Sequence, residues 1–239
     1  MNPAQLVFPR EGEEAPSCTV AYHEECDALF IASCLSAREV SQYYARADSK
    51  KADWLCGRLA AKRAIQAHIE RVSGVTVPYR ELEIISRPQQ PPVLLIEDTA
   101  LPHECIPEHI VFSLAHAAGV AIACVESALR YRAVGVDIEP IRTFEESTLR
   151  AFLTPREYEA YRGLEATARN AFATQRWCIK EAYLKACGVG LRMHPGRIEV
   201  VEKASPDEHI TLSVDGAPVC AVVHWTTMNG VYILVCVGI

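Results

Sequence analysis

The sequence has no uninterrupted apolar run of the roughly 18 residues that a membrane-spanning helix needs. Its start, Met1–Gln5, lacks the basic end and the apolar segment of a secretory signal peptide. Lysine and arginine number 24 against 30 acidic residues, which gives a formal net charge of −6. Nonspecific binding to nucleic acids or membrane surfaces draws on broad positive surfaces, so this balance argues against both. We expect a cytoplasmic protein with no membrane or nucleic-acid partner.

The ten cysteines include no Cys-x-x-Cys pair. Most lie inside apolar segments, as Cys124 and Cys236 do. This pattern is typical of buried free thiols in a reducing compartment and not of zinc ligands or a disulfide framework. His103 and His109 also miss the two-histidine helical spacing of zinc proteases, and Pro107 lies between them.

The chain of 239 residues, 50% of them hydrophobic, can form one large core or two small ones. Helices are expected at 37–46, 50–72, 155–163 and 169–187, with capping residues Ser36 and Thr154. Strands are expected at 82–86, 93–96, 110–114, 120–125, 131–139, 197–202, 209–214, 219–226 and 231–237. We expect two hairpins, one joining 120–125 to 131–139 and one turning at Met228-Asn229-Gly230.

The order of a long helix followed by strands occurs twice, once from Lys50 and once from Arg169. This order favours an α+β architecture of two similar halves. We place the join near Arg130, which gives an N-terminal half of residues 1–130 and a C-terminal half of residues 131–239.

The helix expected at 169–187 carries an apolar stripe that includes Ile179 and Tyr183. Glu181 and Lys185 lie one turn apart on the face roughly opposite Ile179, so both can reach one ligand outside the helix. The alternative is an ordinary surface ion pair contributing about 0.3–0.5 kcal/mol. The functional interpretation predicts an anionic ligand beside Lys185.

The segment Val134-Gly135-Val136-Asp137-Ile138-Glu139 alternates strictly, as a strand does. Asp137 and Glu139 therefore project from the same face, where a divalent cation with oxygen ligands would relieve their repulsion. Gly135 has no side chain and is expected to leave room there for a bulky ligand. The alternative is a solvent-facing strand with two unpaired acids.

Together, Gly-Val-Asp-Ile-Glu and, some forty residues later, Trp177-x-x-Lys180-Glu181-Ala-x-x-Lys185 resemble the signature of the Sfp-type 4′-phosphopantetheinyl transferases. The resemblance extends over nearly the whole chain. It implies that Asp137, Glu139 and Glu181 hold Mg²⁺, with Mn²⁺ as an alternative. It also implies that Lys185 contacts the phosphates of coenzyme A.

Two upstream segments also resemble this family. Ser113-Leu114-Ala115-His116-Ala117 occupies the place of the family's Asn-x-Ser-His-Ser segment, and Gly57-Arg58-x-x-x-Lys62 that of its Gly-Arg-x-x-x-(Arg/Lys) segment. The resemblance implies that His116, Arg58 and Lys62 bind coenzyme A, with His116 on its 3′-phosphate. Two alanines replace the usual hydroxyl residues beside His116, and Gln90-Pro91-Pro92 stands where the family has Gly-(Arg/Lys)-Pro.

The implied fold is a pseudo-dimer of two α+β halves with the ligand between them. The implied reaction moves phosphopantetheine from coenzyme A to a serine of an acyl- or peptidyl-carrier protein, leaving 3′,5′-ADP. Glu181 is then the candidate base, Asp137 a metal ligand needed for catalysis, and Lys185, with Lys180, stabilises charge on the departing phosphate. We expect a monomer.

The carrier protein is expected to dock on residues 141–161. Apolar contacts would come from Phe144, Leu149 and Phe152, beside Arg150 and Arg156. Two other functions are compatible with the same residues: a catalytically idle module that binds carrier protein or coenzyme A, and a metal-dependent hydrolase of another nucleotide diphosphate.

Overall fold

The computed structural model describes residues 5–6, 16–86, 90–96, 101–201 and 210–239. The chain divides into two compact units, unit 1 (residues 1–134) and unit 2 (residues 135–239). Across the described ranges, no helix combines the length and the apolar character that crossing a membrane requires.

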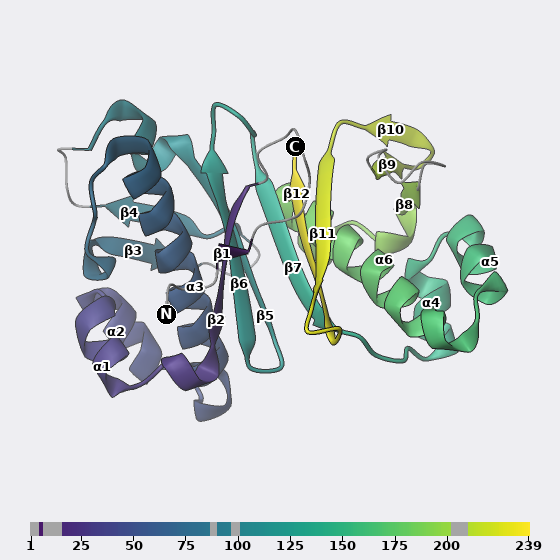
Figure 1. Cartoon of the computed structure of the whole chain (residues 1–239), viewed down its shortest axis with the longest axis horizontal. Coiled ribbons are helices and arrows are strands. Elements are labelled where there is room, and N and C mark those ends of the chain that lie inside the picture. Colours follow the sequence, from purple (N-terminus) through teal and green to yellow (C-terminus); the bar gives the residue numbers. More distant parts are fainter. Residues whose placement is uncertain (1–4, 7–15, 87–89, 97–100, 202–209) are drawn as a thin grey trace. The chain divides into compact units, whose positions relative to one another are not determined.

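Unit 1 is built around one long helix on an antiparallel sheet (Figure 1). Its helices are α1 (Ala28–Cys34), α2 (Ala37–Tyr44) and α3 (Asp48–Ser73). Its strands are β1 (Gln5–Leu6), β2 (Ser17–Tyr22), β3 (Leu82–Ile85), β4 (Val93–Ile96), β5 (Ile110–Ala117) and β6 (Val120–Ser127). The sheet has the order β1-β2-β6-β5, and β3 and β4 form a separate hairpin.

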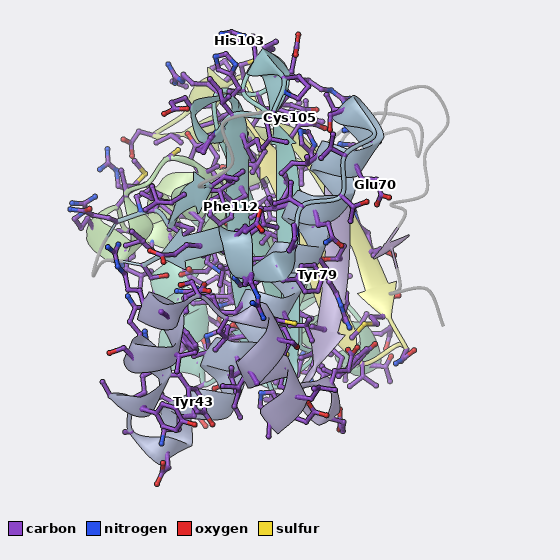
Figure 2. The ribbon with its side chains drawn as sticks, turned by 90° about the vertical axis from the view of Figure 1, so that its left-hand side faces the viewer. Tyr43, Glu70, Tyr79, His103, Cys105 and Phe112 are labelled. Carbon is purple, nitrogen blue, oxygen red and sulfur yellow. The ribbon has the colours of Figure 1, made fainter. Side chains whose placement is uncertain are left out.

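The core of unit 1 lies between α3 and this sheet. Leu59, Ile65 and Ile69 of α3 belong to the same buried cluster as Phe112 of β5. Cys105 joins this cluster from the segment before β5, and Figure 2 looks onto the side of the molecule where both labelled side chains lie. Burial of this stripe is the main reason that so long a helix is stable, because isolated helices are marginal in water.

Unit 2 repeats this plan with its own long helix. Its helices are α4 (Glu146–Phe152), α5 (Pro155–Gly163) and α6 (Ala166–Ala186). Its strands are β7 (Val134–Pro140), β8 (Ile198–Val201), β9 (Thr211–Val214), β10 (Ala217–Val219), β11 (Val222–Met228) and β12 (Tyr232–Gly238). The strands form two sheets, β11-β12-β7 and β10-β9-β8. Ile179 and Tyr183 of α6 are buried in one cluster with Val223 of β11 and Val235 of β12.

The main sheets of the two units share one strand order. In β2-β6-β5 and in β7-β12-β11, an early strand lies beside the last strand of the unit, and the last two strands form an antiparallel hairpin. A smaller antiparallel pair follows the long helix in each unit, β3-β4 and β8-β9. The prediction of an α+β chain with two similar halves is confirmed.

Helix starts follow the capping chemistry of the sequence. Ser36 and Glu39 form a reciprocal capping box at the start of α2, and Thr154 and Glu157 form another at the start of α5. Each box satisfies backbone amides that have no partner inside the helix.

One predicted hairpin is wrong and the other is confirmed. Strand β6 pairs with β5 and β2, whereas β7 lies beside β12. The reason is the turn: Ala118 (φ 49°) and Gly119 (φ 84°) both adopt the left-handed conformation that a two-residue hairpin needs. The expected β11–β12 hairpin does form, with positive φ at Asn229 and Gly230.

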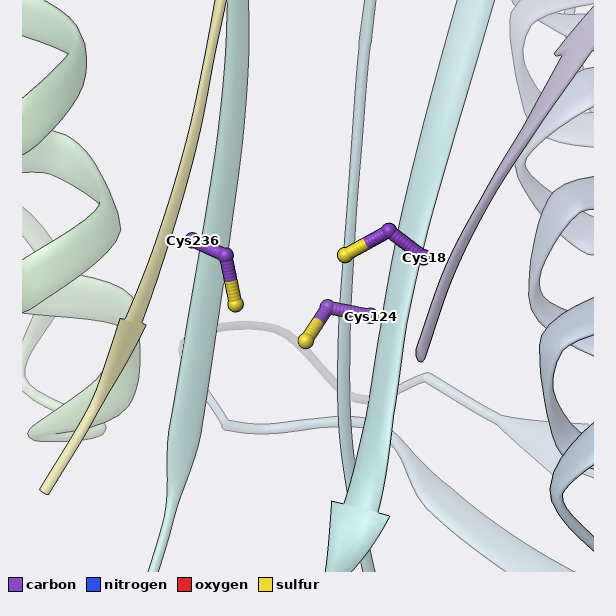
Figure 3. A group of neighbouring side chains, drawn as sticks. All are labelled: Cys18, Cys124 and Cys236. Carbon is purple, nitrogen blue, oxygen red and sulfur yellow. The ribbon is translucent and has the colours of Figure 1, made fainter. Parts of the chain in front are cut away.

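All ten cysteines are free thiols. Cys18 and Cys124 are directly opposite each other on β2 and β6, with side chains on the same face of the unit 1 sheet, while Cys236 is buried on β12 of unit 2 (Figure 3).

Candidate active site

Strand β7 and helix α6 approach each other closely at Gly135. A Cβ atom there would collide with the carbonyl oxygen of Ala182 and lie 2.6 Å from the amide nitrogen of Ala186. Only glycine therefore lets the backbone of α6 rest directly on this strand. The expectation that Gly135 leaves room for a ligand is wrong, because α6 fills that space.

This close contact brings four of the predicted residues together, Asp137 and Glu139 from β7 and Glu181 and Lys185 from α6. Lys185 Nζ donates hydrogen bonds to Asp137 Oδ1 at 2.7 Å and to the carbonyl oxygen of Val136 at 3.1 Å. Burial alone would lower the pKa of Lys185, but the charge and hydrogen bond of Asp137 raise it. Lys185 is therefore a charged ammonium, with its side chain 30% exposed.

Glu139 lies between two donors. Its Oε1 accepts a hydrogen bond from Trp177 Nε1 at 3.2 Å, and its Oε2 lies 3.8 Å from Arg142 Nε. Burial, followed by the neighbouring charge of Asp137, raises the pKa of Glu139. Trp177 thus orients one oxygen of a carboxylate whose ionised form is destabilised by burial and by the charge of Asp137.

Two buried carboxylate oxygens in the site have no hydrogen-bond partner among the described residues, Asp137 Oδ2 and Glu181 Oε1. Burial raises the pKa of Glu181, Lys185 opposes this shift, and the charges of Asp137 and Glu139 add to it. An unpaired buried carboxylate oxygen is costly, so these atoms point to a missing cationic partner.

The donor set suits a hard divalent cation. Three carboxylates and one ammonium leave a net negative site, and carboxylate oxygens are the ligands that Mg²⁺ and Mn²⁺ prefer. A cation bound there would be a partner for both unpaired oxygens, Asp137 Oδ2 and Glu181 Oε1. The residues present therefore fit a site in which Asp137, Glu139 and Glu181 hold the metal.

Lys180, expected to contact a phosphate, lies apart from this group. Its side chain is fully buried. Its Nζ donates to the carbonyl oxygen of Phe152 at 2.6 Å and to Glu157 Oε2 at 2.5 Å. The helical periodicity turns Lys180 about 100° away from Glu181 and into the protein. Lys180 is therefore not among the side chains that can contact an anion outside the protein.

Arg58 and Lys62 of α3 are also internal. Lys62 Nζ lies 2.7 Å from Glu39 Oε2 and donates to the carbonyl oxygens of Tyr79 and Leu82 at 2.7 and 2.6 Å. Arg58 is 1% exposed, and its Nε lies 3.4 Å from Glu39 Oε1. The resemblance-based expectation that these two cations bind coenzyme A conflicts with their burial.

Arg58 has two further neighbours. It donates to Ser86 Oγ at 3.1 Å, and its guanidinium lies 4.6 Å from the ring centroid of Trp54. These contacts, like those of Lys62, lie within unit 1.

His116, in contrast, is accessible. It lies on β5 with its side chain 44% exposed, and its Nδ1 is 3.9 Å from Asp53 Oδ2. His23 Nε2 lies 3.0 Å from the other oxygen of Asp53. The structure therefore adds Asp53 as a neighbour of His116 within unit 1, and Asp53 also pairs with His23.

The expected docking segment also differs from its prediction. Phe144, Leu149 and Phe152 are buried in a core cluster of unit 2. Arg150 and Arg156 are exposed and pair with Glu146 and Glu199. The apolar residues of this segment are therefore core residues, and its charged residues form its surface.

Sequence reasoning missed Trp177 and Glu157 as residues that organise the site. Trp177 stands in the motif itself, so its indole N–H was a visible candidate donor. Glu157 was recognised as a capping residue, but no sequence pattern indicates that its carboxylate also reaches Lys180.

The C-terminal part of the chain matches known proteins. Residues 133–236 match the model of the 4′-phosphopantetheinyl transferase superfamily (ACPS). The 4′-phosphopantetheinyl transferase HetI of Nostoc sp. is 34% identical over 97 residues, which cover 40% of this chain and 38% of that protein. The 4′-phosphopantetheinyl transferase psf-1 of Bacillus pumilus is 26% identical over 121 residues, covering 51% of this chain and 49% of that protein. The chain thus spans at most about half the length of these relatives.

Solved structures give weaker matches. A holo-(acyl-carrier-protein) synthase from Bacillus anthracis in complex with CoA (3′,5′-ADP) is 24% identical with a TM-score of 0.37, covering 44% of this chain and 91% of that one. The holo-[acyl-carrier-protein] synthase of Thermotoga maritima is 22% identical with a TM-score of 0.35, covering 44% of this chain and 60% of that one. Residues 133–236 of this chain, which hold all four clustered site residues, thus match the 4′-phosphopantetheinyl transferase superfamily in the family model and in two curated relatives.

Proposed function

We propose that the protein transfers 4′-phosphopantetheine from coenzyme A to a serine hydroxyl of an apo acyl- or peptidyl-carrier protein, with Mg²⁺ as cofactor. One observation carries the proposal. Inside the region that matches the superfamily, three carboxylates converge with two buried oxygens unpaired among the described residues, beside the ammonium of Lys185. Metal-binding acids next to a cation suit a diphosphate substrate.

When bound, the metal supplies positive charge that neutralises the diphosphate of coenzyme A. The residues of the chain do the rest. Glu181, with a pKa raised by burial, takes the proton of the serine hydroxyl, directly or through water. The serine oxygen forms a bond to the phosphorus of the pantetheine phosphate, and the bond from that phosphorus to the bridging oxygen breaks. The electron pair leaves with 3′,5′-ADP.

Lys185 donates to the phosphate oxygens as their negative charge grows. Asp137 keeps this ammonium protonated and fixes it within the site, because it is both an ion-pair partner and a hydrogen-bond acceptor of Nζ. A preorganised ammonium stabilises developing charge without reorganisation during the reaction.

His116 is our candidate contact for the 3′-phosphate of coenzyme A. It is an accessible imidazole, and its Nδ1 lies 3.9 Å from Asp53 Oδ2. The two similar units in one chain support the Sfp type of transferase, acting as a monomer. We propose that the carrier docks on the surface of residues 141–161 through Arg150 and Arg156, since carrier recognition by charge needs exposed cations.

The test is the intact mass of an apo-carrier protein incubated with the protein, coenzyme A and Mg²⁺. We expect a gain of one phosphopantetheine, and none with Asp137→Ala. Asp215→Ala is the matched control, because this exposed acid of unit 2 forms its ion pair with Arg197 and not with a residue of the candidate site. Cleavage of the diphosphate without carrier modification would indicate a hydrolase instead. Binding of coenzyme A without either reaction would indicate a catalytically idle module.

A further inference from the structure

Each unit buries one glutamate–lysine pair beneath its long helix. In unit 1, Lys62 Nζ lies 2.7 Å from Glu39 Oε2, and in unit 2, Lys180 Nζ lies 2.5 Å from Glu157 Oε2. The two partners are 23 residues apart in both pairs, and all four side chains are at most 3% exposed. We call these pairs the unit 1 clamp and the unit 2 clamp.

The two clamps are built in the same way. Each carboxylate is also the capping-box acid of a short helix, with Ser36 as the cap in unit 1 and Thr154 in unit 2. Each accepts a further hydrogen bond from a strand amide, Ile84 N at 3.2 Å in unit 1 and Val200 N at 3.0 Å in unit 2. One carboxylate thus ties together a helix start, a strand and the long helix.

One turn before each clamp lysine, an arginine stacks on an aromatic ring. Arg58 lies 4.6 Å from the ring centroid of Trp54, and Arg176 lies 4.3 Å from that of Phe172. Together with the shared spacing of 23 residues between glutamate and lysine, these arginine–aromatic contacts allow α3 and α6 to be aligned residue by residue. The sequences themselves show little of it, because most of the residues around these positions differ.

The two units diverge immediately after the clamp. Glu181 follows Lys180 in unit 2, whereas Arg63 follows Lys62 in unit 1 and pairs with Glu25 at 2.6 Å. Unit 1 thus keeps the clamp without the carboxylate that follows it in unit 2. The chain therefore contains a natural internal control, a clamp of the same construction with no metal-binding acid beside it.

We infer that the unit 2 clamp is a positioning device for the metal centre: Glu157 and Lys180 fix the rotation of α6 so that Glu181 faces Asp137 and Glu139. This inference rests on the proposed function of that centre. Contact at Gly135 sets the distance between α6 and β7, but a helix can still rotate over such a contact. A rotation of about 10° moves a side-chain tip at a helix radius of about 5–6 Å by about 1 Å.

Stability alone does not account for the clamp. A buried ion pair is often no more stabilising than well-packed apolar residues of similar volume, because both charges lose their hydration. A pair that fixes geometry has a further role. Supporting residues outside the ligands typically change metal affinity by about 10–100-fold when they are lost.

The experiment compares matched variants of the full-length protein. Lys180→Met is paired with Lys62→Met. Because a lone buried carboxylate can prevent folding, Glu157→Gln/Lys180→Met is paired with Glu39→Gln/Lys62→Met, in which both charges of the clamp are removed together. Arg176 and Arg58, which lie near the two clamp carboxylates in matched positions, are retained in both double variants. Mn²⁺ affinity is measured by electron paramagnetic resonance, melting temperature by calorimetry, and transfer by intact mass of the carrier.

We expect both unit 2 variants to bind Mn²⁺ at least about tenfold more weakly than wild type. Both unit 1 variants should bind Mn²⁺ with an affinity within about twofold of wild type. This difference between the units should persist when matched variants have equal melting temperatures. Equal affinities in matched variants of the two units would overturn the inference, as would recovery of full affinity in the unit 2 double variant. Wild-type protein that neither binds Mn²⁺ nor modifies a carrier would instead refute the proposed function.

Discussion

Gly135→Ala tests the contact on which the candidate site depends. A new Cβ atom would lie 2.6 Å from the amide nitrogen of Ala186 and closer still to the carbonyl oxygen of Ala182. Ordinary non-bonded contacts lie at about 3.5–4 Å, so α6 must withdraw from β7 by about 1 Å or more. The contacting atoms are backbone, so no side-chain rotation can relieve the clash.

We expect this substitution to lower the free energy of unfolding by about 1–3 kcal/mol, the usual range for overpacking a core. We also expect it to abolish transfer in the molecules that remain folded, since a displacement of about 1 Å can reduce catalysis by about a hundredfold. Denaturant unfolding gives the first value, and carrier modification per folded molecule gives the second. Gly163→Ala is the control, because nothing lies within 4 Å of a Cβ at that position. Unchanged stability and transfer in Gly135→Ala would refute the packing argument.

Ile179→Ala should lower stability by about 2–5 kcal/mol, measured by denaturant unfolding, and change transfer per folded molecule much less, because this side chain is fully buried in the core of unit 2. Lys185→Ala should slow transfer without preventing metal binding, as steady-state rates and calorimetry would show; loss of metal binding would contradict its phosphate role. His116→Ala should weaken coenzyme A by about tenfold but leave dephospho-coenzyme A unchanged in calorimetry, whereas Arg58→Ala should mainly lower the melting temperature. The pKa of Glu181 is raised above its ordinary value of 4.5, so protein without metal should lose stability as the pH rises from 4.5 through the raised pKa. Glu181→Gln should therefore raise the melting temperature measured without metal at neutral pH. The melting temperature of this variant should no longer respond to added Mg²⁺.

Local signals in the sequence predicted much of the fold. The capping boxes located the starts of α2 and α5, and Asn229-Gly230 located the last hairpin. Periodicity placed α3 and α6 within a few residues of their observed bounds. These features depend on neighbours in the chain, which is why sequence alone reveals them.

Long-range partners were harder to predict. Strand β7 pairs with β12, a partner nearly a hundred residues away in the chain, and no local pattern distinguishes it from the neighbouring β6. Gly135 could equally have made room for a ligand or for a helix, and only the position of α6 decides between them.

Buried charges were harder still. Arginine and lysine are the residue types that bind anions, which is why the sequence suggested that role for Arg58, Lys62 and Lys180. Each of these side chains instead points inward to a carboxylate. Their partner acids lie roughly twenty residues earlier in the chain, where the sequence shows only capping residues. The pairing of an internal cation with a capping acid depends on tertiary structure, which periodicity does not encode.

Asp137, Glu139 and Glu181 are proposed to form the metal centre of the transfer reaction. The most direct test of this proposal is the initial rate of carrier modification as Mg²⁺ is titrated, for wild type, Asp137→Ala and Glu181→Gln, with folding of each variant checked by circular dichroism. We expect the wild-type rate to rise from near zero to saturation, and both variants to remain inactive at every Mg²⁺ concentration. Turnover near the wild-type rate at saturating Mg²⁺ in either folded variant would contradict the assignment.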